Sequence, residues 1–426
     1  MLVLGSFATS SVGVLFWLVA ARHLGRAELG RDAAILSLVM LAAGLGGLDW
    51  PNALPRYLPG AAAAARRFVR VVQLCAVGLS VVAGAVLVVV AAGVTPALGH
   101  LVHSPWHLAA FLGAVAVWSA FSLQDAVLIG LGRERWLLVA NLVFALAKLG
   151  VLGLLVASAR SSAVVVSWIV PALVMTLVVQ LAVVRPALEV RLTAPVAVAS
   201  TGAVALPSAR RLSGLVLTGA AANLVGTLVV GLMPLVVTAH LGTAATAGYQ
   251  LAWSAAYVLF LAPRYVAQAV LARSGTGPGG LDDVLRAALT GSLVLVGAAT
   301  AVAVVVAGPV LDLVGSSYRH DTTALLRLMA LASLPHCVLV LAGAWARAHQ
   351  RPRWAVVVTS AEHLTVMLLA LVLLPGNGVA ALGWAWLLGE SVVAAAVLVV
   401  YRHRARRRAV VVDHHLTGEP IVGAPN

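Results

Sequence analysis

Charged residues are scarce in this chain of 426 residues, of which they make up only 10%. Soluble globular domains are about 25% charged and about 45–50% apolar, whereas 62% of this sequence is hydrophobic. The composition therefore excludes a water-soluble enzyme, a disordered chain and a fibrous protein. A bilayer span needs about 20 apolar residues, so the sequence has enough of them for about a dozen transmembrane helices.

Cysteine and lysine are scarce as well. Only Cys75 and Cys337 are present, both inside apolar runs, which excludes a disulfide framework and a cysteine-based metal site. The only lysine, Lys148, is followed by Leu149, whereas a P-loop requires Gly-Lys-Ser or Gly-Lys-Thr. The sequence thus predicts neither a metal nor a cofactor. Because no basic residue precedes the N-terminal apolar run, we interpret it as the first span rather than as a signal peptide.

Long apolar runs make up most of the chain. Because lipid cannot hydrogen-bond to the backbone, each run is expected to be a helix. The predicted spans cover residues 1–21, 33–50, 69–93, 108–130, 136–157, 163–184, 213–239, 250–272, 284–307, 323–345, 354–374 and 377–401. We expect a six-helix lobe at residues 1–184, a cytoplasmic linker at 185–212, a second six-helix lobe at 213–401 and a basic cytoplasmic tail at 402–426.

Arginine is distributed unevenly among the loops. With a cytoplasmic N-terminus, the inner loops and the tail hold 20 Arg residues, whereas the outer loops hold only Arg22, Arg26, Arg31, Arg160, Arg319 and Arg327. Cytoplasmic loops are rich in Lys and Arg, so both termini are expected on the cytoplasmic side of the plasma (inner) membrane. The net charge of +14 is then mostly a consequence of topology, and nucleic-acid binding is not predicted.

The two halves share short motifs. His23-Leu24-Gly25 recurs as His240-Leu241-Gly242 after the first span of each half, and Arg135-Trp136 recurs as Arg353-Trp354 before the fifth. Two matches at nearly the same offset indicate a duplicated unit. Because each unit has an even number of spans, the repeats are expected to be parallel, with a substrate site between them. The sequence therefore predicts an all-α integral membrane protein with about 12 transmembrane helices in two parallel six-helix repeats around a central cavity.

One helix is predicted to present polar groups to that cavity. An ionisable side chain at mid-bilayer costs at least about 2.5 kcal/mol, so it is a functional candidate. Lys148 lies twelve residues beyond the cytoplasmic start of its span, about 18 Å deep, and Asn141 lies two turns earlier on the same face. We expect both to face the cavity. The alternative is a structural pair between Lys148 and Asp125 on the preceding span.

Further cations and amides are candidates for the same space. Arg264 and Gln268 form a polar face one turn apart in the eighth span, although Arg264 could also extend toward the membrane surface. Arg56 lies just beyond the second span, near Pro51 and Pro55, and is either a third cavity cation or a cytoplasmic anchor. Two polar sets are more typical of packing surfaces than of ligand sites: Ser6, Thr9, Ser10 and Gly13 in the first span, and Asn223 and Thr227 in the seventh.

Two acids in the last spans are candidates for ion coupling. Glu362, beside His363, lies near the middle of the eleventh span, and Glu390 lies near the middle of the twelfth. A carboxylate in apolar surroundings can exchange a proton near neutral pH or bind sodium, and Asp125 is a third candidate of this kind. The alternative is a static hydrogen bond between helices, with His336 as a partner.

The beginning of the chain resembles that of a known transporter family. Ala20–Gly30 reads AARHLGRAELG, and after an apolar helix Ala53–Pro59 reads ALPRYLP. This pattern resembles the start of Wzx-type polysaccharide flippases, with Leu24, Gly25 and Glu28 at matching positions. The resemblance implies a MATE-like fold of the multidrug, oligosaccharidyl-lipid and polysaccharide exporter superfamily, in which two six-helix bundles open alternately to either side.

The cations distinguish between the branches of that superfamily. Its oligosaccharide branch moves polyprenyl-pyrophosphate-linked glycans to the outer leaflet, and its drug branch exports organic cations. An ammonium and a guanidinium in the cavity would repel a cationic drug but would bind a pyrophosphate. We therefore expect an ion-coupled flippase for cell-surface polysaccharide biosynthesis. Lys148, Arg264 and Arg56 would bind the pyrophosphate, and Asn141 and Gln268 would bind sugar or phosphate.

The expected partners are a polyprenyl-pyrophosphate-linked glycan, a proton or sodium ion, and membrane lipids. A polysaccharide polymerase or glycosyltransferases are further candidate partners. The alternatives are a MATE-like exporter of small amphipathic molecules, a membrane-embedded glycan ligase or polymerase, and a lipid scramblase or assembly scaffold. An enzyme is disfavoured because the predicted outer loops are short, whereas membrane enzymes acting on glycans generally work in sizeable loops.

Overall fold

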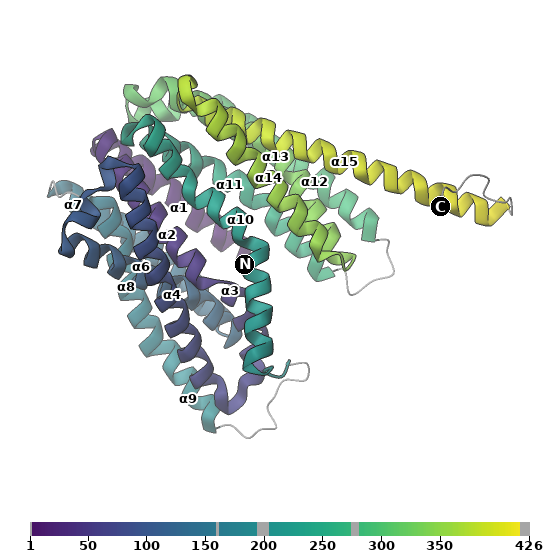
Figure 1. The fold of residues 1–426 in the computed structure, drawn as a ribbon, viewed down its shortest axis with the longest axis horizontal. Coiled ribbons are helices and arrows are strands. Elements are labelled where there is room, and N and C mark those ends of the chain that lie inside the picture. The colour runs from purple at the N-terminus through teal and green to yellow at the C-terminus, as the bar shows by residue number, and fades with distance from the viewer. Residues whose placement is uncertain (1, 159–161, 194–203, 274–280, 418–426) are drawn as a thin grey trace.

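Two groups of helices meet at one end of the molecule and diverge at the other (Figure 1). The computed structural model describes residues 2–158, 162–193, 204–273 and 281–417. The N-terminal group contains α1 (Leu2–His23), α2 (Arg26–Gly47), α3 (Trp50–Tyr57), η1 (Pro59–Ala64), α4 (Ala65–Val94), η2 (Pro96–Leu98), α5 (His100–His103), α6 (Pro105–Gly130), α7 (Glu134–Ala157), α8 (Ala163–Val179), η3 (Gln180–Val184) and α9 (Arg185–Thr193). We call this group the N-lobe.

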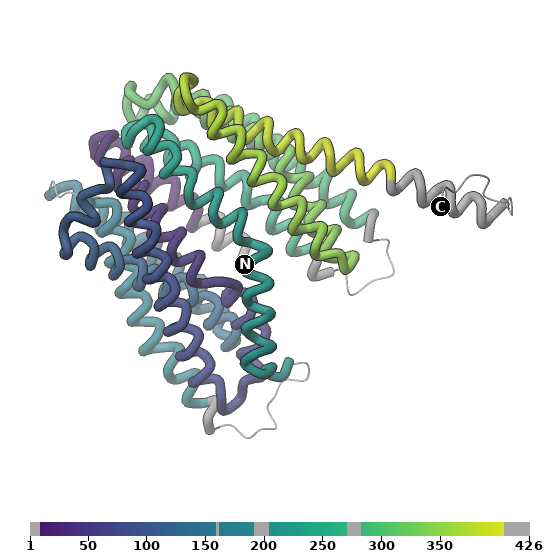
Figure 2. The backbone as a smooth tube through the Cα atoms, in the orientation of Figure 1, coloured from purple at the N-terminus to yellow at the C-terminus, as the bar shows by residue number. Residues whose placement is uncertain are grey.

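The remaining helices form the C-lobe and a connection to it. The C-lobe contains α11 (Thr243–Arg273), α12 (Leu281–Val314), η5 (Ser316–Tyr318), α13 (Arg319–Ala348), α14 (Pro352–Asn377) and α15 (Ala380–Thr417). Helix α10 (Ala209–Leu241) runs between the lobes, from the divergent end to the end where they meet (Figure 2). Part of the predicted linker, residues 194–203, lies outside the described residues.

Each of the twelve predicted spans corresponds to one long helix. By length and hydropathy, ten of these helices are able to cross a membrane. The other two are α1, with 22 residues, and α11, with 31. No strand occurs in the part of the chain that the structure describes. The prediction of an all-α, multi-pass membrane protein is therefore confirmed.

The second span differs from its prediction at both ends. Helix α2 starts at Arg26 rather than at residue 33, and it ends at Gly47, where Leu48 adopts φ +48°. Its charged first two turns, which precede the predicted span, are helical, and Asp32 in the second turn is buried against α8. The chain continues in the short helix α3, so the second span is broken before Pro51 and Pro55.

Asp32 connects α2 to the start of α8. Its side chain is fully buried, and its Oδ2 accepts a hydrogen bond of 3.1 Å from the backbone N–H of Val164. The first N–H groups of a helix have no partner inside the helix and attract negative charge. Asp32 therefore caps α8 from another helix and fixes the packing of both.

Replacing Asp32 with alanine should lower the free energy of unfolding by about 1–3 kcal/mol, because the buried N–H of Val164 would lose its acceptor. Asp32→Asn should cost less, since its amide oxygen can still accept the bond. Thermal unfolding of both variants in the same detergent is the measurement. If Asp32→Ala and Asp32→Asn unfold at the wild-type temperature, the cap has no structural importance.

Candidate functional site

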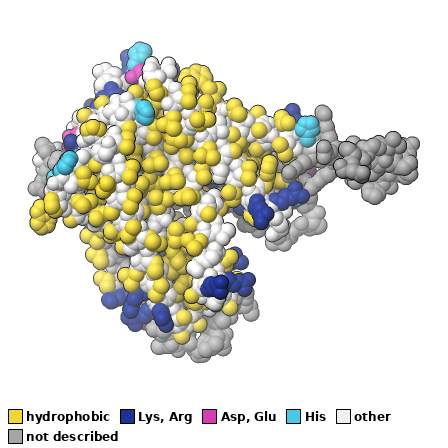
Figure 3. All heavy atoms as spheres, in the orientation of Figure 1, with side chains coloured by type: hydrophobic (Ala, Val, Ile, Leu, Met, Phe, Trp, Pro, Cys, Tyr) yellow, Lys and Arg dark blue, Asp and Glu magenta, His cyan; other side chains and the backbone are white. Residues whose placement is uncertain are grey.

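A cavity lies between the two lobes. Its N-lobe part encloses about 1260 Å³ and is lined by α1, α2, α7, α8, α10 and α11. Its C-lobe part encloses about 1730 Å³ and is lined mainly by α10, α11, α13 and α14. Val230, Trp253 and Tyr257 line both parts, so the two parts adjoin. The space-filling view shows a hollow between the lobes, with Lys and Arg side chains at the divergent end of each lobe (Figure 3).

Lys148 lines the N-lobe part within a cage of aromatic rings. Its Nζ lies 4.0 Å from the ring centroid of Trp168, 5.3 Å from that of Phe16 and 5.5 Å from that of Phe144. The side chain is only 5% exposed. No carboxylate among the described residues lies within ion-pair distance of it. Ring faces stabilise a cation only partly, so the ammonium is available to an anionic group that enters the cavity.

Asn141 and Asp125 do not line either part of the cavity. The Asn141 amide donates a hydrogen bond of 3.1 Å from Nδ2 to Oδ2 of Asp125, which joins α7 to α6. The expectation that Asn141 faces the cavity beside Lys148 is therefore not met, because the nearer acceptor on α6 takes its amide. The alternative pair between Lys148 and Asp125 is also absent from the structure. This leaves Asp125 in a contact between helices of the N-lobe.

The C-lobe part has its own cations. Arg264 and Gln268, one turn apart on α11, line it as expected. Arg56 does not: it is exposed on α3, with its guanidinium 5.3 Å from the ring centroid of Tyr57. Arg347 lines the cavity instead. The predicted span 323–345 ends before Arg347, but α13 extends to Ala348 and so places Arg347 on the cavity wall.

Small polar residues complete the wall. Thr9, Ser10 and Gly13 of α1 line the N-lobe part, and Asn223 and Thr227 of α10 line the C-lobe part. These residues were expected in packing surfaces, and the structure places them on the cavity wall. Because α1 and α10 are the first helices of the two halves, each half contributes a polar helix face to the cavity.

A buried cluster of His336, Glu362 and Glu390 lies beside the C-lobe part. Nδ1 of His336 is 3.0 Å from Oε1 of Glu362 and 3.3 Å from Oε1 of Glu390, so three different helices meet here. Glu390 is fully buried, and among the described residues neither of its oxygens accepts a hydrogen bond. Two carboxylates and one imidazole leave a deficit of positive charge. One proton or one cation would satisfy the unpaired oxygens.

The cluster and the cavity share a wall. Glu362 and His336 line the C-lobe part together with Arg264, whereas Glu390 lies behind them. Arg264 interacts electrostatically with both carboxylates. The ligating atoms of the cluster lie within 4.8 Å of one another, close enough to hold one ion. An ion at the cluster and an anion at Arg264 would therefore influence each other directly.

At the end where the lobes meet, which we call the closed end, arginines of the N-lobe bind backbone carbonyls of the C-lobe. Arg22 donates to the carbonyl of Leu313, and NH1 of Arg26 donates to that of Ser317 at 2.6 Å. The Arg26 guanidinium also lies 4.8 Å from the ring centroid of Tyr318. Last-turn carbonyls of a helix carry partial negative charge, so these contacts hold the lobes together here.

Close contact between α2 and α11 gives a second prediction. A Cβ on Gly30 would collide with the carbonyl of Thr243, so Gly30→Ala should destabilise the closed end by about 1–3 kcal/mol. A cysteine at Ser10, in a background with Cys75 and Cys337 replaced by serine, should then react faster with an impermeant maleimide added on the side of the closed end.

Gly47→Ala on the same helix is the matched control, because a Cβ at Gly47 meets no atom within 4 Å. It should leave the labelling rate of the cysteine at position 10 unchanged. Equal rates in the Gly30 and Gly47 variants would show that contact at Gly30 does not keep this end closed.

Comparisons with known proteins support the fold. No family model matches the sequence, and a search of curated proteins found no match. The lipid II flippase MurJ in an inward closed conformation is similar in structure, with a TM-score of 0.71 and 11% identity over 94% of this chain and 87% of that chain. An inward-facing MATE family transporter of the MOP superfamily has a TM-score of 0.59 and 14% identity over 92% and 98%.

A MATE transporter from Vibrio cholerae has the same TM-score of 0.59, with 14% identity over 95% of each chain. These likenesses extend over nearly the whole chain, and at such identities they concern the fold alone. They confirm the prediction of a MATE-like, two-lobed architecture.

Proposed function

We propose that the protein is a flippase that moves a polyprenyl-pyrophosphate-linked oligosaccharide from the cytoplasmic to the outer leaflet for cell-surface polysaccharide biosynthesis. The observation that carries this proposal is the set of cations on the cavity wall. Lys148, which pairs with no carboxylate of the described residues, lies in one part, and Arg264 and Arg347 lie in the other. A pyrophosphate accepts charge-assisted hydrogen bonds from such groups. The likeness to MurJ, a lipid II flippase, supports the same class of substrate.

Both parts of the cavity would contact this substrate. Lys148 would bind the pyrophosphate, with Arg264 and Arg347 on the opposite lobe as a second anchor. Trp253 and Tyr257, which line both parts, would contact the sugars. Gln268 would hydrogen-bond to sugar hydroxyls. The polyprenyl chain would remain in lipid between the lobes.

The membrane orientation follows from charge. The divergent end of each lobe carries Lys and Arg side chains (Figure 3), which favours placing this end in the cytoplasm with both termini. The cavity would then be open to the cytoplasm and closed by Arg22 and Arg26 on the outer side. Alternating access requires these contacts to break as the lobes rotate.

Transport would be coupled to a proton or sodium ion at the cluster of His336, Glu362 and Glu390. When the cluster holds the ion, its charge is balanced and the carboxylates attract Arg264 less. When the ion leaves, the carboxylates attract Arg264 and compete with the pyrophosphate. This exchange would link movement of the substrate to an ion gradient.

A MATE-like exporter of small amphipathic molecules is the second candidate. Its support is the likeness to MATE transporters together with the acidic cluster and the aromatic wall formed by Trp253, Tyr257 and Phe260. This function requires the cavity to accept cations, and Lys148 and Arg264 oppose that.

Binding separates the two candidates before transport is measured. Purified protein should bind a short-chain polyprenyl pyrophosphate more tightly than the corresponding monophosphate, and it should not bind a lipophilic cation such as tetraphenylphosphonium. Isothermal titration calorimetry in detergent is the measurement. Tight binding of the cation with no binding of the pyrophosphate would reject the flippase in favour of the exporter.

A further inference from the structure

Three helices of the C-lobe bring one nitrogen and two carboxylate ligands together. Nδ1 of His336 on α13 lies 3.0 Å from Oε1 of Glu362 on α14 and 3.3 Å from Oε1 of Glu390 on α15. A metal that binds its ligands at about 2.0–2.2 Å in a tetrahedral arrangement holds them roughly 3.3–3.6 Å apart. The two separations from Nδ1 are therefore already close to those of a metal site.

Two members of this cluster have buried polar atoms without a partner. Glu390 is fully buried, and neither of its oxygens accepts a hydrogen bond from a described residue. Nε2 of His336 is also buried and unpaired within the described part of the chain. The Phe260 ring packs at right angles to the imidazole, with the ring centroids 4.8 Å apart, which restricts rotation of His336. Because buried polar atoms are rarely left unpaired, the bare carboxylate of Glu390 indicates a missing ligand.

The charge of the cluster fits a divalent ion. A metal binds neutral imidazole and ionised carboxylates, so His336, Glu362 and Glu390 as ligands would carry two negative charges in total. One divalent ion cancels both charges, whereas a monovalent ion on the same ligands leaves a costly buried negative charge. Arg264 is exposed in the cavity, where water screens its charge.

The nitrogen ligand distinguishes among divalent ions. Mg²⁺ and Ca²⁺ take oxygen ligands, whereas imidazole suits Zn²⁺ and the neighbouring transition metals. Zn²⁺ is bound by His nitrogen and by Glu oxygen, and a site with three protein ligands leaves the fourth tetrahedral position to water. One histidine and two glutamates therefore favour an ion of the zinc class.

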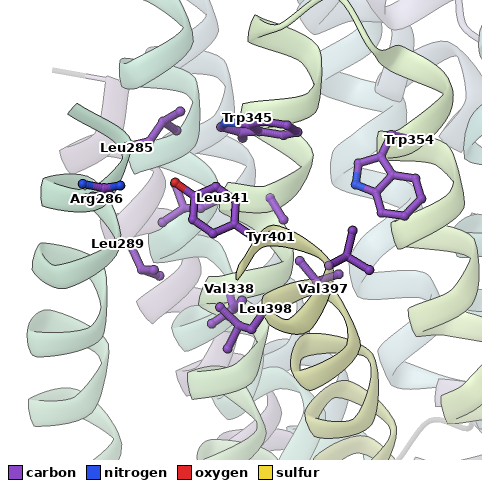
Figure 4. Close-up of a pocket in the computed structure, with 12 residues that line it drawn as sticks. Leu285, Arg286, Leu289, Val338, Leu341, Trp345, Trp354, Val397, Leu398 and Tyr401 are labelled. Carbon is purple, nitrogen blue, oxygen red and sulfur yellow. The ribbon is translucent and has the colours of Figure 1, made fainter. Parts of the chain in front are cut away.

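An ion reaches the cluster from the central cavity. His336 and Glu362 line the C-lobe part of that cavity, and Glu390 lies behind them. Helix α13 also borders an apolar groove of the C-lobe, where Val338 and Leu341 are part of the wall (Figure 4). No member of the cluster lines that groove, so the cavity is the route of entry.

We propose that His336, Glu362 and Glu390 bind one divalent transition-metal ion of the zinc class. The bound metal would connect α13, α14 and α15 and would occupy the place of the coupling proton or sodium ion. Metal binding itself is independent of the proposed function, and only the competition with a coupling ion rests on it. Zn²⁺ is therefore expected to suppress the acceleration of transport by an ion gradient.

Cobalt is the probe, because Co²⁺ takes the same ligands as Zn²⁺ and absorbs visible light when it is four-coordinate. The purified full chain, freed of affinity tags and stripped with a chelator, should bind one equivalent of Co²⁺ with these absorption bands. Zn²⁺ should displace the Co²⁺, and excess Mg²⁺ should not. X-ray absorption of the zinc-loaded wild type should show an imidazole ligand, and this measurement needs no variant.

Variants assign the metal to the cluster. His336→Gln and Glu390→Gln should each weaken Co²⁺ binding by at least about tenfold, since even a residue that only supports a ligand contributes about 10- to 100-fold to affinity. His320→Gln is the matched control, because His320 is exposed on the same helix, and it should bind Co²⁺ like the wild type. Thermal unfolding without metal identifies any variant that has lost its fold.

Three results would overturn the metal site: no absorption bands with Co²⁺, equal affinity in His336→Gln and His320→Gln, or displacement of Co²⁺ by Mg²⁺. A transporter that keeps its full response to an ion gradient with Zn²⁺ bound would overturn the competition with the coupling ion. A wild type that binds the metal but moves no glycan would reject the proposed function and leave the metal site standing.

Discussion

Replacing Lys148 with alanine should lower the initial rate of translocation of a polyprenyl-pyrophosphate oligosaccharide by about 10- to 100-fold. Hydrogen bonds to charged groups contribute about 1.5–3 kcal/mol each, and in the N-lobe part of the cavity Lys148 is the cation that would bind the pyrophosphate. The rate is measured in proteoliposomes, from the protection of a fluorescent substrate against an impermeant quencher. Folding should be nearly unaffected, since the ammonium pairs with no described carboxylate.

Two further substitutions separate charge from packing at this position. Lys148→Met keeps most of the volume inside the aromatic cage but removes the charge, so it should be as inactive as Lys148→Ala. Lys148→Arg should restore part of the rate. Arg66→Ala removes an exposed cation outside the cavity and should transport like the wild type. Wild-type rates in Lys148→Ala would remove Lys148 from the mechanism.

The second large effect is expected at the buried cluster. Glu390→Gln should abolish the acceleration of transport by an imposed ion gradient, because the variant lacks one of the two carboxylates that would hold the ion. Glu362→Gln should do the same and also change substrate affinity, since Glu362 lines the cavity beside Arg264. Transport is compared with and without a proton gradient, and with and without a sodium gradient, which also identifies the coupling ion.

Glu134→Gln is the control for these variants. Glu134 is exposed at the start of α7, outside the cluster, so its neutralisation should leave the response to a gradient unchanged. His336→Gln should weaken the response, because the imidazole contacts both carboxylates. If Glu362→Gln and Glu390→Gln still respond fully to both gradients, the cluster is a static contact between helices.

The helices could be predicted from the sequence because lipid imposes a simple rule: a long apolar run must be a helix. The ends of the helices could not be predicted, because a hydropathy pattern excludes charged residues from a span. In the folded protein, tertiary contacts hold such residues inside the helix. Asp32 was read as loop, although its carboxylate finds the N–H of Val164. Arg347 was assigned to a loop for the same reason, although α13 continues through it.

Site residues could be predicted only where the depth of a residue in the membrane determines its environment. Lys148 is too far from either end of its helix to reach water, so a cavity was the expected surrounding, and it lines one. Asn141 lies on the same helix face as Lys148, but its amide binds Asp125 on α6 instead. That contact depends on how the two helices pack, which the sequence does not show. A contact between helices was expected only as an alternative role for the acids, with His336 as the partner. Spacing along the chain does not determine interhelical register, so the sequence could not show that His336 contacts both Glu362 and Glu390.

The central claim is that an anionic, prenyl-linked glycan is the transported molecule. The most direct measurement places wild-type protein in liposomes with a fluorescent polyprenyl-pyrophosphate oligosaccharide, and in parallel with a lipophilic cation. The proposed function predicts that the glycan crosses the bilayer, that excess unlabelled polyprenyl pyrophosphate inhibits its movement, and that the cation does not accumulate. Export of the cation without movement of the glycan would contradict this claim and assign the protein to drug export.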